Sequence, residues 1–208
     1  NNGETGSVTF IGTVSPAGGN LKEPVTESTK KAARCFYALS QNRADSKRYP
    51  AIDTLDSYSK YLEYPEFISF AKEKLDENWV ELVNEARNIL VRGKETEEQI
   101  NILGDDSVPI DYHVTLWKSE FVDFVILQQD AFDKIDATTS LERQEFMLKK
   151  VIGVTRSEFR FENFEEVAIY FKRLINAFRQ MNYTIFKSEE FKKAEEEANM
   201  VLEERLIK

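Results

Sequence analysis

The sequence predicts a mainly α fold, in which a C-terminal helical bundle is attached to the last strand–helix part of an α/β unit. Up to about residue 63 it mixes β-forming residues with Gly, Pro and Ser, whereas from Pro65 onward apolar residues recur at helical spacing almost without a break. Hydrophobic residues make up 41% of the 208, which is enough to build a core. We therefore expect residues 1–63 to be the remnant of an α/β domain and residues 64–208 to be a helical domain.

The first part carries both strand and loop signals. Residues 7–14 alternate and are rich in β-formers, which predicts a strand. Residues 15–20 (SPAGGN) predict a loop, because a proline and two adjacent glycines break regular structure. A short helix is expected from Glu27 to Leu39, with apolar residues on one face. Ala51 and Ile52 are expected to end a short buried strand.

The second part is marked by helix start and stop signals. An Asn or Thr followed three residues later by Glu is typical of a capping box. The predicted boxes are Asn78–Glu81, Thr139–Glu142 and Asn163–Glu166. Gly104 is expected to end a short helix over residues 96–103, since a glycine adopts the left-handed C-cap conformation without steric cost. From Ser188 a charged helix with a thin apolar seam is expected.

The composition excludes several classes of function. A formal charge of -9 and a pI near 4.9 argue against nucleic acid as a partner, because phosphate binding needs a basic surface. Cys35 is the only cysteine and His113 the only histidine, which excludes an internal disulfide, Ser-His-Asp catalysis and most zinc sites. We expect His113 on the surface near the start of a helix. No apolar run is long enough to insert into a membrane, and no GxxxxGK[ST] phosphate loop is present.

Three segments carry a family resemblance in the right order along the chain. They are VSPAGGNLKEPVTEST at 14–29, RYPAIDTLDSYSKYL at 48–62 and ILQQDAF at 126–132. The combination of EPVT, PAI and QQxAF resembles the catalytic A subunits of V/A-type (vacuolar/archaeal) rotary ATPases, over about residues 7–150. The resemblance implies a C-terminal part of that subunit without its phosphate loop. It therefore implies no catalytic residue and no metal ligand in this sequence, and no ATP hydrolysis by this part alone.

The resemblance also implies an adenine pocket formed by Tyr49, Ala131 and Phe132. A purine presents a flat π-face and few charges, so aromatic walls can hold it by stacking, which is worth about 1–3 kcal/mol per base. The alternative is that Tyr49 is an ordinary core or loop aromatic and that Phe132 plugs the core. Arg34 and Arg48 are expected to have structural or surface roles, because in this family the transition-state arginine comes from a neighbouring subunit.

Residues 102–109 (ILGDDSVP) fall where the related β chain of ATP synthases has an acidic loop that contacts the rotor. The candidate contact residues are Gly104, Asp105, Asp106 and Ser107. Ser-Val-Pro stands here in place of further acidic residues, so contact through shape is expected rather than contact through charge. The alternative is a solvated turn.

The resemblance finally implies the setting of the full subunit. It would bind ATP or ADP with Mg²⁺, alternate with non-catalytic B subunits in a hexamer, and contact a central rotor stalk and a peripheral stalk. Proton or sodium transport would be coupled to ATP hydrolysis or synthesis, on the cytoplasmic side of a membrane. Two other interpretations stay open, namely a stand-alone helical interaction module and the non-catalytic sister subunit.

Overall fold

The computed structural model describes residue 3 and residues 6–207. Its first part consists of short helices and a two-stranded antiparallel sheet, and its second part of longer helices. The elements of the first part are η1 (Ala17–Gly19), α1 (Pro24–Ala32), β1 (Cys35–Leu39), α2 (Gln41–Asp45), β2 (Ile52–Ser59) and η2 (Lys60–Glu63). Those of the second part are α3 (Pro65–Lys74), α4 (Trp79–Leu103), η3 (Asp105–Ser107), α5 (Ile110–Val122), the π-helical turn η4 (Asp123–Leu127), α6 (Leu141–Arg156), α7 (Phe164–Asn182) and α8 (Glu189–Glu203).

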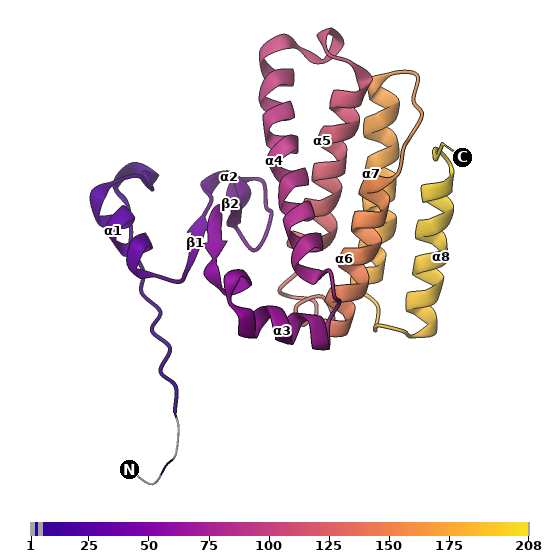
Figure 1. The fold of residues 1–208 in the computed structure, drawn as a ribbon. Coiled ribbons are helices and arrows are strands. Elements are labelled where there is room, and N and C mark those ends of the chain that lie inside the picture. The colour runs from indigo at the N-terminus through magenta and orange to yellow at the C-terminus, as the bar shows by residue number, and fades with distance from the viewer. Residues whose placement is uncertain (1–2, 4–5, 208) are drawn as a thin grey trace.

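The helical bundle is the larger part, as the sequence predicts. Figure 1 shows α4, α5, α7 and α8 upright beside one another, with α1 and the β1–β2 hairpin to one side and α3 beneath. The core is continuous from α5 through α6 and α7 to α8, and its largest fully buried side chains include Phe121, Phe171 and Phe178. Because each helix contributes one apolar stripe to this core, their common burial holds the bundle together.

Helices α4 and α5 approach each other closely at Gly93. A Cβ atom built on Gly93 would lie 2.1 Å from both Cβ and Oγ of Ser119. Gly93 is buried within α4, and Ser119 is buried within α5. The absence of a side chain at residue 93 therefore sets the distance between these two helices.

Two expectations for the first part are wrong. Residues 7–14 form no strand: they are extended coil with exposed apolar side chains, because no neighbouring strand pairs with their backbone. The expected helix from Glu27 to Leu39 is divided instead into α1, which starts at Pro24, and strand β1. Leu39 pairs with Ile52 of β2, so pairing across the hairpin overrides the helical pattern. A strand does lie at this point, but it differs from the expected one: β2 begins at Ile52 instead of ending there, runs for eight residues, leaves Ala51 outside, and has Ile52 only half-buried.

Helix boundaries in the second part follow the sequence with two shifts. Asn78 stands at the N-cap of α4, but its side chain makes no capping hydrogen bond within the described residues, so the expected box with Glu81 is wrong. The separate helix expected over 96–103 is wrong, because α4 is continuous and only its end, at Gly104 with φ 87°, is as predicted. The cap of α6 is Ser140, whose Oγ accepts from the Arg143 N–H, rather than the expected Thr139. Asn163 caps α7 as predicted and accepts from the Glu166 N–H at 2.9 Å.

The β1–β2 hairpin is fastened to the bundle by Arg87 of α4. Its guanidinium donates to the backbone carbonyls of Thr54, Leu55 and Ser57 at 2.8–3.2 Å. One side chain thereby satisfies three carbonyls of β2, which fixes the sheet relative to α4. None of the helices among the described residues has the length and apolar character needed to cross a membrane.

Candidate functional site

The two segments expected to form an adenine pocket lie side by side, although they are far apart in the sequence. The backbone N–H of Gln129 donates to the carbonyl of Tyr49 at 2.8 Å. The Tyr49 side chain is 51% exposed and that of Phe132 is 98% exposed, and Ala131 is exposed as well. Phe132 is therefore not the core plug that the alternative interpretation expects, and Tyr49 is not a core aromatic, whereas the alternative of an ordinary loop aromatic stays open for Tyr49.

Three aspartates order the loop that carries Phe132. The carboxylate of Asp130 accepts from the Phe132 N–H at 2.9 Å, and that of Asp133 accepts from two N–H groups further along the loop. Asp136, which is only 5% exposed, accepts from the Asp130 N–H at 2.6 Å. Side chains that bond to nearby backbone groups substitute for regular structure, so this loop has a defined path.

Burial raises the pKa of the Asp136 carboxyl above its ordinary value, and the Asp130 N–H and the charge of Arg143 offset only part of that rise. In the unfolded chain an aspartate has a pKa of about 3.9. The folded state therefore keeps the Asp136 proton to a higher pH than the unfolded state does. As the pH rises from the pKa of the unfolded state through the pKa of the folded state, the contribution of Asp136 to the free energy of unfolding falls.

We expect Asp136→Asn to remove the decrease in the free energy of unfolding that Asp136 causes as the pH rises. Asparagine is neutral at every pH and still offers an oxygen to the Asp130 N–H. Its stability relative to the natural chain should increase between acid and neutral pH, as measured by urea unfolding. Asp45→Asn on the exposed surface of α2 is the control. A stability difference that does not change with pH would contradict the role of Asp136.

An ion network joins the segment before Tyr49 to the end of α5. Arg48 donates through Nη2 to Glu120 at 2.7 Å and through Nη1 to both Glu120, at 3.1 Å, and Asp123, at 2.8 Å. The other oxygen of Asp123 accepts from Nη1 of Arg43 at 2.7 Å. The carboxylate of Asp123 is only 6% exposed, and two guanidinium groups balance two carboxylates. Arg48 therefore has the structural role expected for it.

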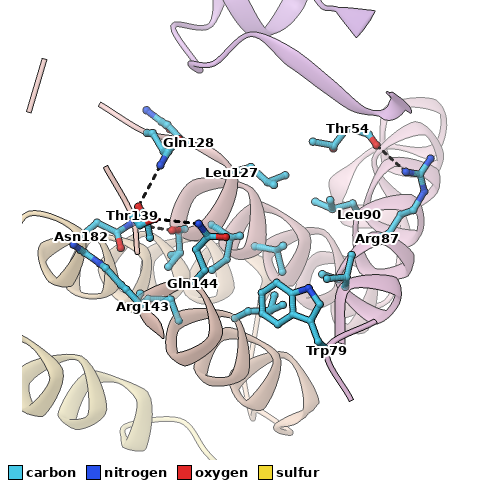
Figure 2. Close-up of a pocket in the computed structure, with 18 of the residues that line it drawn as sticks. Thr54, Trp79, Arg87, Leu90, Leu127, Gln128, Thr139, Arg143, Gln144 and Asn182 are labelled. Atoms are coloured by element: carbon cyan, nitrogen blue, oxygen red, sulfur yellow. Dashed lines mark hydrogen bonds between the residues drawn. The ribbon is translucent and has the colours of Figure 1, made fainter. Parts of the chain in front are cut away.

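A cavity of about 450 Å³ lies between β2, α4, η4 and α6. Figure 2 shows Trp79 and Leu90 of α4 on one side of it, and Gln128 and Thr139 on the other. Its lining is largely apolar, with Asp136 among the polar groups. Tyr49, Ala131 and Phe132 do not line it, so the expected adenine walls are a separate surface, although Gln129 lines the cavity and its backbone N–H donates to Tyr49.

The loop expected to contact a rotor lies at the far end of α5 from the ion network. Gly104 and the 3-10 turn of Asp105, Asp106 and Ser107 are all exposed. His113 was expected on the surface, but it is only 4% exposed. Its Nε2 is 3.1 Å from the carbonyl oxygen of Asp105, and its ring stacks on Phe164 at the start of α7 with the centroids 5.0 Å apart. Through His113 the exposed turn is held against the bundle.

Sequence reasoning missed Arg43, Glu120 and Asp123, because contacts across 72 to 80 residues leave no local pattern. The position of His113 did carry a signal, since it lies three residues after Ile110 and four before Trp117 on the buried face of α5. Within the described residues no group of three or more His, Cys, Asp or Glu side chains is placed to hold a metal ion.

Two family models match successive parts of the chain. Residues 1–59 match the nucleotide-binding domain of the ATP synthase alpha/beta family, and residues 69–167 match the C-terminal domain of V and A type ATP synthase. The point at which one match gives way to the other falls close to the end of the β1–β2 hairpin. Between them the two models match most of the chain.

Individual relatives agree with these matches. A V-type ATP synthase alpha chain of Borrelia duttonii (strain Ly) is 40% identical over 195 residues, which are 94% of this chain and 32% of the relative. The alpha chain of Protochlamydia amoebophila (strain UWE25) is 36% identical over 203 residues, 98% of this chain and 34% of the relative. The chain thus spans about a third of the length of the curated relatives it matches.

A solved structure resembles the chain in fold. The ATP synthase subunit NeqB from Nanoarcheaum equitans superposes with a TM-score of 0.51 and 20% identity, over 67% of this chain and 32% of that one. At that identity the likeness concerns the fold alone. The two matched domains and the identity with named alpha chains lead to the same assignment. The chain belongs to the V- and A-type ATP synthases and corresponds to a C-terminal part of their A subunit, the chain that the relatives' names call alpha.

Proposed function

We propose that this chain supplies the adenine-facing walls and the rotor-contacting helical domain of the catalytic subunit of a V/A-type rotary ATPase. The full subunit would bind ATP or ADP with Mg²⁺, and would couple hydrolysis or synthesis of ATP to proton or sodium transport. It would alternate with non-catalytic B subunits in a hexamer, contact the central and peripheral stalks, and lie on the cytoplasmic side of the membrane. The chain alone would not hydrolyse ATP.

The observation that carries the proposal is the hydrogen bond between Gln129 and Tyr49. It brings together the two segments that would form the adenine walls, although they are 80 residues apart in the sequence. Tyr49 and Phe132 are both exposed, so both rings are accessible to a ligand that stacks on them. The Ala131 methyl lies on the same exposed segment and would add apolar surface beside the base.

The division of labour within the chain is part of the proposal. Residues 1–63 would belong to the nucleotide-binding domain and residues 64–208 to the helical domain, which the change of family model between residues 59 and 69 supports. The exposed turn Gly104, Asp105, Asp106 and Ser107 would contact the rotor. Its position at the exposed end of α4 and α5 supports that role, because a turn at the end of two long helices can reach a neighbouring subunit.

We expect Tyr49→Ala and Phe132→Ala, each made in the full-length subunit of the assembled enzyme, to weaken binding of ATP. Loss of one stacking wall is worth about 1–3 kcal/mol, which corresponds to roughly a 5- to 150-fold higher dissociation constant. Equilibrium titration with a fluorescent ATP analogue, displaced by ATP itself, measures the change.

Tyr37→Ala is the matched control, because Tyr37 is also an exposed tyrosine of the hairpin but lies on β1, away from the Gln129 contact. The control should bind ATP as the natural enzyme does. Unchanged ATP binding by both the Tyr49 and Phe132 variants would show that these residues are not the adenine walls.

A further inference from the structure

Arg48 immediately precedes Tyr49 and is anchored on α5. We infer that Arg48 is a positioning residue, which holds the Tyr49 ring at the place where it stacks on the base. This inference rests on the proposed adenine site. It adds to that site Arg48, a residue that does not contact the nucleotide but determines the position of the Tyr49 ring.

The Arg48 side chain is held in one orientation. Its two terminal nitrogens form a fork against Glu120, and Nη1 also reaches Asp123. The guanidinium carbon lies 4.5 Å from the centroid of the Phe124 ring, so the planar group is also stacked on an aromatic face. Three charged hydrogen bonds and a stacked plane leave the guanidinium little freedom to rotate.

Backbone hydrogen bonds also hold the Arg48–Tyr49 dipeptide at both of its ends. The Arg48 N–H donates to the carbonyl of Arg43 at 2.8 Å, and the carbonyl of Tyr49 accepts from Gln129 at 2.8 Å. By contrast the Tyr49 side chain is about half exposed. Half of the side chain is therefore free of packing, and the backbone at residues 48 and 49, which fixes the Cα–Cβ direction, contributes to where the ring lies.

Lysine cannot replace arginine in this arrangement. An ammonium group keeps the positive charge, but it is a single point and cannot form the fork with Glu120 while also reaching Asp123 and stacking on Phe124. Arg48→Lys therefore retains the positive charge of the network, but the side chain at residue 48 is no longer held in one orientation. This substitution separates positioning from simple charge balance.

The test is the steady-state kinetics of ATP hydrolysis by the assembled enzyme carrying Arg48→Lys, Tyr49→Ala or both. We expect Arg48→Lys to raise KM for ATP by roughly threefold to tenfold with little change in kcat, because a misplaced wall weakens binding without touching the phosphates. If Arg48 acts through Tyr49, the double variant should have the KM of Tyr49→Ala to within about twofold.

The control is Arg156→Lys. Arg156 of α6 forms the same kind of fork with Glu85 of α4, at 2.6 and 2.9 Å, but outside the site. It should leave KM unchanged. Should the Arg48 variant not assemble, Glu120→Gln weakens the same fork and should raise KM in the same direction, again without adding to Tyr49→Ala.

Three results overturn the inference. An unchanged KM in the Arg48→Lys or Glu120→Gln enzyme does so directly. Effects of Arg48→Lys and Tyr49→Ala that multiply in the double variant show a structural role independent of the ring. If Tyr49→Ala itself leaves KM unchanged, the proposed adenine site is wrong, and the positioning role of Arg48 is rejected together with it.

Discussion

Asp123→Ala is expected to lower the free energy of unfolding by about 3–5 kcal/mol, the usual cost of removing one partner from a buried ion pair. Asp123 is the one carboxylate that both guanidinium groups of the network share. Within the described residues, Nε and Nη2 of Arg43 are buried and have no hydrogen-bond partner. Asp123 is the only charged group among those residues that forms an ion pair with the Arg43 guanidinium. Without Asp123 two cations would face one carboxylate in a partly desolvated site. Urea unfolding at neutral pH measures the loss.

Two further variants separate charge from hydrogen bonding. Asp123→Asn keeps an oxygen acceptor and should lose less stability than Asp123→Ala. Combining Asp123→Ala with Arg43→Met removes the unpaired cation, so the double variant should be more stable than the sum of the two single losses predicts. Additive losses would show that Arg43 and Asp123 do not interact in solution.

Gly93→Ala is expected to lower the free energy of unfolding by about 1–3 kcal/mol, as overpacking of a close contact does. The added methyl would lie 2.1 Å from Cβ of Ser119, an atom that no side-chain rotation can move away. Helices α4 and α5 would have to separate. Alanine favours helix over glycine by about 1 kcal/mol in an open helix, so a net loss of stability would come from the contact and not from the backbone.

Ser119→Gly should rescue this variant, because it removes the atoms that the new methyl would meet. The next atom of Ser119, its Cα, is 3.6 Å from the built Cβ, which is an ordinary contact distance. In the Ser119→Gly background, Gly93→Ala should therefore cost little or even stabilise. A cost that is the same in both backgrounds would place the strain elsewhere. Thermal unfolding of the natural chain, the two single variants and the double variant forms the cycle.

What could be predicted from the sequence is what depends on neighbours along the chain. The stripe from Val167 to Phe178 is buried in α7, because helical periodicity depends only on residues three and four apart. The stop at Gly104 is equally local, since it follows from the conformational freedom of one residue.

Features that need a distant partner could not be predicted in this way. Residues 7–14 have a strand-like composition but remain coil, because a strand needs another strand beside it. Leu39 fitted a helical stripe and lies in a strand, because Ile52 pairs with it. At the candidate site the family resemblance indicated the two segments that are proposed to form the adenine walls, but the hydrogen bond between them and the anchor of Arg48 on α5 belong to the three-dimensional arrangement alone.

Helix α5 is a rigid element that side-chain contacts hold at both ends. Its 13 residues span roughly 20 Å at 1.5 Å per residue. One end is tied to the exposed turn through His113 and Asp105, and the other is tied to the Arg48 segment through Glu120 and Asp123. A continuous helix is stiff along its axis, whereas side-chain contacts yield first. If the Arg48 segment moved further than its charged contacts can stretch, either those contacts would break or α5 would shift as a whole. In the second case the turn at the opposite end of α5 would move with it.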